Sequence, residues 1–233
     1  MTQLAFDLPQ RPALGREDFL VADCNAEAVA WLDRWPDWPR AGRLPAALAI
    51  HGPAGCGKTH LASVWQAVSA ARRIEPRQVT AETVPALLEG ADAIVLDGLT
   101  ADIDERGLFH LLNLLGERDG HLLITAALPP ARWAIALPDL KSRLAALPAI
   151  GVGAPDEALL AAVMVKLFAD RQLMVSQELV QFLLPRIERS FAAVQSIVDR
   201  LDKAALISRR NITVPLARAL LAGGNTENDK EGN

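Results

Sequence analysis

Cysteine is scarce in this sequence: only Cys24 and Cys56 occur among 233 residues. A small secreted protein held together by disulfides carries more cysteines, so the count favours a reducing cytoplasm. Long hydrophobic runs are also missing. The first residues, MTQLAFDLPQRP, hold no apolar stretch long enough for a signal peptide, and no segment approaches the roughly 20 apolar residues that span a bilayer. We therefore expect a cytoplasmic protein that does not contact membranes.

An excess of positive charge is missing as well. The chain carries 28 acidic and 24 basic residues, a formal net charge of −4. This balance argues against a broad basic face that grips nucleic acid, although a local patch stays open, and we expect no direct sequence-specific DNA binding. Hydrophobic residues make up 51% and charged residues 22%, which excludes a disordered chain and favours a packed globular one.

Residues 23–153 alternate short apolar runs with helical patterns. The apolar runs are predicted strands, and helical spacing is predicted after Asn25 and over 57–70 and 104–120. Strands that look continuously apolar are typical of a parallel sheet buried on both faces. The sequence therefore predicts an α/β domain, preceded by an N-terminal arm over 1–22. The predicted strands lie at 46–52, 93–98, 121–128 and 149–155.

The pattern changes near residues 152–156, where we expect a domain boundary. Four helical segments follow, over 155–172, 176–187, 190–209 and 213–221. They predict a small all-α domain over 154–222, and the polar, Gly-rich tail 223–233 is predicted to be disordered. Plausible N-cap residues precede the segments: Asp156, Ser176, Ser190 and Thr213.

The segment GPAGCGKT fits the phosphate-loop pattern G-x-x-x-x-G-K-T. Its glycines let backbone N–H groups surround phosphate oxygens, its lysine reaches the β and γ phosphates, and its threonine hydroxyl is a Mg²⁺ ligand. A plain Gly-rich turn is the alternative, but the loop follows an apolar run and opens a helical pattern. We predict nucleotide binding by Gly52, Pro53, Ala54, Gly55, Cys56, Gly57, Lys58, Thr59 and His60.

A single acid, Asp97, ends the apolar run of the segment IVLDGLT. In phosphate-loop folds an acid at such a strand end holds Mg²⁺, directly or through water. A strand-end aspartate in an ordinary turn is the alternative. Together with the phosphate loop, the position favours a Mg²⁺ site formed by Thr59 and Asp97.

The five tryptophans, Trp31, Trp35, Trp38, Trp65 and Trp133, are expected to pack in the core or between helices. A second interpretation places the segment WPDWP, residues 35–39, beside an adenine pocket.

A phosphate-loop domain followed by a helical domain resembles the AAA+ ATPases. Four segments resemble those of one AAA+ family, the bacterial replication initiator DnaA: DFLVADCN at 18–25, LLITAALPP at 122–130, LPDLKSRL at 137–144 and SFAAVQSIVDRLDKAAL at 190–206. The resemblance covers about 18–222. DnaA continues into a DNA-binding domain after its helical lid, whereas this sequence ends at the predicted lid and begins with QLAFDLP.

That combination resembles the Hda group of DnaA-related regulatory inactivators. The resemblance implies negative regulation of replication initiation, with bound ADP or ATP and Mg²⁺. It implies two partners, the DNA polymerase III β sliding clamp and DnaA, and allows a homodimer. It assigns Arg143 as an arginine that stimulates hydrolysis of ATP on DnaA in trans. The clamp-binding peptide would use Gln3, Leu4, Phe6 and Leu8, whose amide and apolar side chains suit a polar pocket beside an apolar groove.

Compared with the AAA+ ATPases that it resembles, the sequence lacks three groups that promote turnover of ATP. Gly98 follows Asp97 where many such enzymes have a second carboxylate, Ala127 stands where relatives often have an acid, and Ala192 occupies the place of a lid arginine. Holding a nucleotide and hydrolysing it are separate demands, so we expect weak or no intrinsic ATPase. Two alternatives remain, an AAA+ motor or loader that turns over ATP and an adaptor that recruits a factor without affecting hydrolysis; a small-molecule kinase ranks last.

Overall fold

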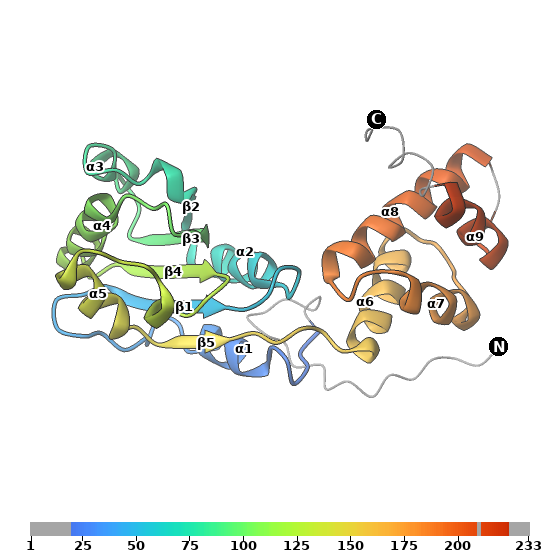
Figure 1. The fold of residues 1–233 in the computed structure, drawn as a ribbon, viewed down its shortest axis with the longest axis horizontal. Helices are drawn as coiled ribbons and strands as arrows, with labels where there is room; N and C mark the ends of the chain where they lie inside the picture. Colours follow the sequence, from blue (N-terminus) through green and yellow to red (C-terminus); the bar gives the residue numbers. More distant parts are fainter. Residues whose placement is uncertain (1–19, 209–210, 224–233) are drawn as a thin grey trace. The chain divides into compact units, whose positions relative to one another are not determined.

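A computed structural model of the chain describes residues 20–208 and 211–223 (Figure 1). Gln3, Leu4, Phe6 and Leu8 of the predicted clamp peptide and the tail from 224 onward lie outside these residues. The described residues divide into two compact units, which meet in sequence between Gly153 and Ala154. We call them the α/β unit and the helical unit. The predicted fold class, a parallel α/β domain followed by a small all-α domain, is confirmed.

The α/β unit is built on a five-stranded sheet whose order is β2-β3-β4-β1-β5, with every neighbouring pair parallel. Four of the strands are the predicted apolar runs. β2 has no apolar run that would predict it, because it is only three residues long and begins with two arginines. The strands are β1 (Ala46–His51), β2 (Arg72–Ile74), β3 (Ala93–Leu99), β4 (His121–Ala126) and β5 (Ala149–Gly151).

Helices cover both faces of the sheet (Figure 1). Successive strand side chains point to opposite faces, so each central strand contributes to two cores. In β3, Ile94 and Leu96 pack in one core while Val95 packs in the other. This double burial is the reason that the strands have no polar alternation. One face carries α1 (Ala26–Asp33) and α2 (Lys58–Ser69), and the other carries α3 (Val84–Leu87), α4 (Glu105–Glu117) and α5 (Pro138–Ala145).

The helical unit contains the four predicted helices, which pack around one apolar core. Three of the predicted N-caps are observed: the side chains of Asp156, Ser176 and Ser190 each accept a hydrogen bond from a backbone N–H three residues later. The helices are α6 (Glu157–Asp170), α7 (Gln177–Leu183), α8 (Phe191–Ser208) and α9 (Val214–Gly223). Short 3₁₀ turns lie at Pro76–Gln78, Pro130–Arg132 and Leu184–Arg186.

The tryptophans near α1 form an aromatic cluster at the amino-terminal edge of the sheet. The rings of Trp38 and Trp65 stack with centroids 5.0 Å apart, and Trp35 meets Trp65 edge-on. Both Trp35 and Trp38 also contact His121, the first residue of β4. The phosphate loop follows the other end of β1, roughly 16 Å along the strand at about 3.3 Å per residue. The expectation of core packing is therefore confirmed for this cluster, and the adenine-pocket interpretation of residues 35–39 is wrong.

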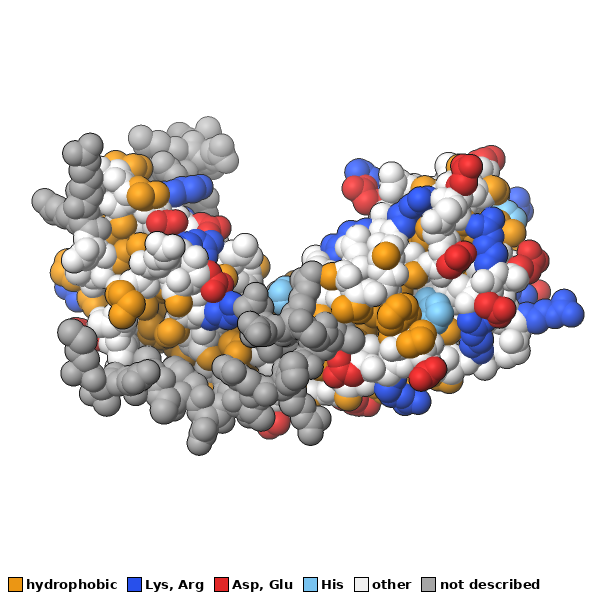
Figure 2. All heavy atoms as spheres, turned by 180° about the vertical axis from the view of Figure 1, so that it is seen from behind, with side chains coloured by type: hydrophobic (Ala, Val, Ile, Leu, Met, Phe, Trp, Pro, Cys, Tyr) orange, Lys and Arg blue, Asp and Glu red, His pale blue; other side chains and the backbone are white. Residues whose placement is uncertain are grey.

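Charged side chains are interspersed on the molecular face that Figure 2 draws. Basic and acidic groups alternate there and neither sign gathers into one broad field. None of the helices described in the structure is long and apolar enough to cross a membrane.

Helix α4 contains a glycine that its packing requires. A Cβ on Gly116 would lie 2.0 Å from the carbonyl oxygen of Arg43, in the segment that precedes β1. Replacing a helical glycine by alanine normally stabilises a helix by up to about 1 kcal/mol. Here the close approach of two backbones reverses that expectation, since one of them must shift.

We predict that Gly116→Ala lowers the free energy of unfolding by about 1–3 kcal/mol, measured by urea denaturation of the full chain. The adjacent exposed residue supplies the control: Glu117→Ala should change stability by less than about 0.5 kcal/mol. A Gly116→Ala protein as stable as the wild type would contradict the close contact between α4 and the segment before β1.

Candidate nucleotide-binding site

The predicted phosphate loop lies between the end of β1 at His51 and the start of α2 at Lys58. Gly57 precedes the helix with φ +98°, a conformation that favours glycine. A Cβ on Gly52 would lie 2.2 Å from the carbonyl oxygen of Val152, so only glycine fits beside the chain that leaves β5. This strand–loop–helix arrangement is the context that lets a Gly-rich loop bind phosphate.

Lys58 holds the loop through its side chain. Its Nζ donates to the carbonyl oxygens of Gly52 and Pro53, each at 2.8 Å, and lies 3.7 Å from Cys56 Sγ. Cys56 is only 2% exposed, which suits a small packing residue better than a reactive nucleophile. His60 lies exposed in the first turn of α2. The ammonium of Lys58 therefore lies against the first two residues of the loop.

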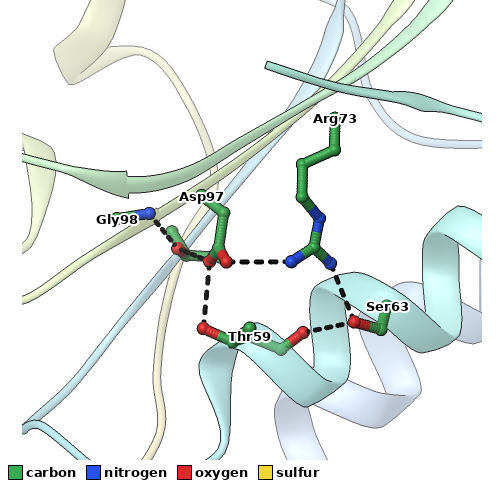
Figure 3. A network of polar contacts seen from close by, with 6 residues as sticks. Thr59, Ser63, Arg73, Asp97 and Gly98 are labelled. Carbon is green, nitrogen blue, oxygen red and sulfur yellow. Dashed lines mark hydrogen bonds and ion pairs between the residues drawn. The ribbon is translucent and has the colours of Figure 1, made fainter. Parts of the chain in front are cut away.

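The carboxylate of Asp97 is the centre of a polar network at the carboxyl ends of the strands (Figure 3). Its Oδ1 accepts hydrogen bonds from Thr59 Oγ1 at 3.3 Å and from Thr125 Oγ1 at 2.6 Å. Asp97 lies on β3, Thr125 on β4 and Thr59 in the first turn of α2. The network therefore brings together the two predicted Mg²⁺ ligands, Thr59 and Asp97.

Arg73 also belongs to this network, although no sequence motif predicts it there. Its Nη1 lies 3.1 Å from Asp97 Oδ2, and its Nη2 donates to Ser63 Oγ at 2.8 Å. Ser63 Oγ in turn donates to the carbonyl oxygen of Thr59. Arg73 comes from β2, the strand that was not predicted, so nothing in its local pattern placed it beside Asp97. Thr125 was not predicted either, because it stands within the apolar run of β4.

Gly98 has a backbone role as well as lacking a side chain. Its φ is +77°, and its N–H donates to Thr125 Oγ1 at 2.7 Å. At this point the register between β3 and β4 shifts: Leu96 pairs with Ile124 but Leu99 pairs with Ala126. One extra residue on β3 makes a bulge, and a left-handed residue in a bulge favours glycine. No carboxylate follows Asp97, and Ala127 after β4 is exposed and supplies none.

The acids nearest to Gly98 in sequence have other hydrogen-bond partners. Asp104 caps α4 by accepting from Gly107 N–H, and Glu105 accepts from the N–H groups of the two residues before α5. Asp102 accepts from the hydroxyl of Thr100, which lowers the pKa of that carboxyl. None of these contacts directs a carboxylate toward the phosphate loop.

The segment before α1 lies beside the phosphate loop. Cys24 accepts a hydrogen bond from Gly153 N–H at 2.9 Å, and Gly153 follows Val152, the residue that Gly52 approaches. Asn25 stands at the N-cap position of α1, but its side chain accepts from Ala22 N–H and donates to Leu20 O instead. It orders the segment rather than capping the helix.

His51, at the end of β1, lies close to this edge of the loop. Burial, then the positive charges of Arg132 and Lys58, lower the pKa of its imidazole. His51 is therefore neutral at pH 7 and adds no charge beside the loop.

Arg143 lies far from this network, on α5. Its Cζ stands 4.3 Å from the centroid of the Phe109 ring, and its Nη1 donates to Asn113 Oδ1. Both partners belong to α4. A hollow of about 460 Å³ beside Arg143 is also lined by Arg43 and other residues at the opposite end of β1 from the phosphate loop. The structure thus keeps Arg143 away from the chain's own phosphate loop.

Ala192 lies exposed in the first turn of α8, in the helical unit.

The donor set at Asp97 fits Mg²⁺, a hard cation that prefers oxygen and is usually bound by few protein ligands together with phosphates and water. Thr59 Oγ1 and the Asp97 carboxylate supply such oxygens side by side. Among the residues that the structure describes, no group of three or more His, Cys, Asp or Glu side chains could hold a metal by itself. A cation at this position would therefore depend on nucleotide phosphates for its remaining ligands.

Comparison with known proteins agrees with this arrangement. Residues 157–221 match the family described as the lid domain of Hda. A protein of Haemophilus influenzae described as uncharacterised is 29% identical over 185 residues, which are 74% of this chain and 80% of that protein. Domain III of the Thermotoga maritima replication initiation protein DnaA superposes with a TM-score of 0.74 at 20% identity, over 92% of this chain and 98% of that one.

AMPPCP-bound DnaA from Aquifex aeolicus also superposes, with a TM-score of 0.63 at 16% identity, over 84% of this chain and 67% of that one. At these identities the structural matches establish the fold, while the sequence match assigns the helical unit. The helical unit thus matches the lid domain of Hda, and the chain as a whole has a fold similar to that of domain III of DnaA.

Proposed function

We propose that this chain is a nucleotide-bound negative regulator of replication initiation that stimulates hydrolysis of ATP held by DnaA. The observation that carries the proposal is the composition of the nucleotide site. It retains Lys58, Thr59 and Asp97, which hold phosphate and Mg²⁺, but has Gly98 in a left-handed bulge where a second carboxylate would help to activate water.

Nucleotide binding is supported by the geometry of the loop and by the related fold. The ligand of the A. aeolicus DnaA, AMPPCP, is an adenine nucleotide analogue, and we extend adenine-nucleotide binding to this chain. The backbone N–H groups of residues 52–59 would bind the phosphates, and Lys58 would exchange its contacts with loop carbonyls for phosphate oxygens. Thr59 and Asp97 supply the oxygens that would hold a Mg²⁺ ion bound together with the nucleotide.

Stimulation of DnaA would depend on Arg143. An arginine supplied in trans stabilises the charge that spreads over the transferring γ-phosphate, because its planar guanidinium donates two parallel hydrogen bonds. Phe109 and Asn113 hold this guanidinium in one orientation on α4. DnaA would supply the groups that position water. The hollow beside Arg143 leaves room for part of a partner.

Retention at replicated DNA would depend on the N-terminal peptide Gln3, Leu4, Phe6 and Leu8 as a ligand of the DNA polymerase III β sliding clamp. This step rests on the sequence pattern alone, since these residues lie outside the described part of the chain.

The function is tested by one series of hydrolysis measurements. We predict that the protein with ATP alone shows little turnover, and that DnaA loaded with labelled ATP hydrolyses it quickly once the protein and clamp on DNA are added. Turnover without DnaA would favour the motor or loader alternative, and an unchanged nucleotide state of DnaA would favour the adaptor.

We predict that Arg143→Ala abolishes stimulation, with a loss on the order of 10³-fold or more in the DnaA-dependent rate, while clamp binding stays unchanged and the protein stays folded. Lys141→Ala, an exposed cation two residues earlier on α5, is the matched control and should stimulate normally. The assay should cover a range of protein concentrations, because a homodimer could bury Arg143. Normal stimulation by Arg143→Ala would remove the arginine from the mechanism.

We predict that deletion of residues 1–9 abolishes retention on clamp-loaded DNA, measured by surface plasmon resonance, without lowering the melting temperature. Replacing Gln3 and Leu4 by alanine is the smaller change and should weaken retention in the same direction. A truncated protein that is retained as well as the full chain would exclude the peptide as the clamp ligand.

A further inference from the structure

Arg73 forms an ion pair with the Asp97 carboxylate, and two contacts fix its position. The guanidinium bonds to Asp97 Oδ2 through Nη1 and to Ser63 Oγ through Nη2 (Figure 3). Ser63 lies one turn after Thr59 on α2 and is itself tied to the carbonyl oxygen of Thr59. The arginine is therefore built into the wall of the nucleotide site rather than resting against it from solvent.

The neighbouring arginine shows that β2 does not need this contact for its own attachment. Arg72 donates to the carbonyl oxygens of Leu87 and Glu89, which tie β2 to the end of α3. Backbone pairing in register with β3 holds the strand as well. Arg73, from the same strand, instead places its charge on the carboxylate that a Mg²⁺ ion would use.

This arrangement changes the electrostatics of the metal position. The side chains of Asp97 and Arg73 are only 17% and 31% exposed, so solvent screens them less than it screens a surface pair. A guanidinium keeps its positive charge at every working pH. The Arg73 guanidinium already neutralises the Asp97 carboxylate and repels a divalent cation that approaches it. Both effects weaken metal binding at Asp97.

We propose that Arg73 is a positioning residue that replaces much of the charge of Mg²⁺ at Asp97, so that this chain binds adenine nucleotides with little dependence on Mg²⁺. The inference rests on the nucleotide binding proposed above and names a property of that same site. Lys58 and the backbone of the phosphate loop then carry the phosphate contacts, and Arg73 holds Asp97 and Thr59 in place without a metal.

The test measures the affinity of the full-length, nucleotide-free protein for fluorescently labelled ADP, in EDTA and in millimolar MgCl₂. We expect the wild-type affinity to differ by less than about threefold between the two conditions. Arg73→Gln removes the charge but keeps a side chain that can hydrogen-bond, and we expect Mg²⁺ to tighten its ADP binding about tenfold or more. Arg73→Lys restores the charge and should behave like the wild type.

A matched control separates this effect from the general loss of a positive charge. Arg77 forms an exposed ion pair with Glu75 shortly after β2. The variant Arg77→Gln should show the same Mg²⁺ dependence of ADP binding as the wild type. Thermal melting of every variant checks folding. An equal Mg²⁺ dependence in wild type, Arg73→Gln and Arg73→Lys overturns the inference and leaves nucleotide binding intact. Absence of ADP and ATP binding by the wild type overturns the proposed nucleotide site and this inference with it.

Discussion

The carboxylate of Asp97 is the interaction on which the site depends. It joins α2 through Thr59, β4 through Thr125 and β2 through Arg73. These elements are separate in sequence, and parallel strands bring their carboxyl ends to one edge of the sheet. The phosphate loop starts at that same edge, after β1. The position of Lys58 relative to any bound cation is thus set by how β3, β4 and α2 pack, which the two apolar cores on either side of the sheet determine.

The groups proposed to bind phosphate and the arginine proposed to act in trans are separated in this molecule. Lys58 lies in the loop after β1, whereas Arg143 lies beside the segment that precedes β1. A six-residue strand lies between them, roughly 16 Å from end to end at about 3.3 Å per residue. Arg143 therefore cannot serve the nucleotide of its own α/β unit without unfolding α5 from α4. Phe109 and Asn113 fix the orientation of the Arg143 guanidinium. This placement supports the proposed action of Arg143 on a nucleotide bound by another protein.

Local sequence pattern predicted the elements whose signal is local. The apolar runs predicted four strands, and the 3.6-residue period predicted α1, α2 and α4 before Pro155 and the four helices after it, but not α3 or α5. The phosphate loop and Asp97 could be predicted as a site because their motif fixes chemistry and spacing together, and the structure places Thr59 and Asp97 within hydrogen-bond distance. Arg73 and Thr125 were missed because their roles arise from strand order, which no short segment encodes. Arg143 was identified through resemblance alone, and its partners on α4 became visible only when α5 was packed against that helix.

Gly98 lacks a carboxylate and also has a role in the backbone of β3. From the sequence, a missing carboxylate suggested weak turnover. In the structure the residue also lets β3 bulge, and its N–H bonds to the Thr125 hydroxyl that in turn donates to Asp97. A side chain there would have to adopt a left-handed backbone that most residues disfavour. The backbone at Gly98 thus supports the position of the Asp97 carboxylate. The same left-handed conformation disfavours an acidic side chain at residue 98.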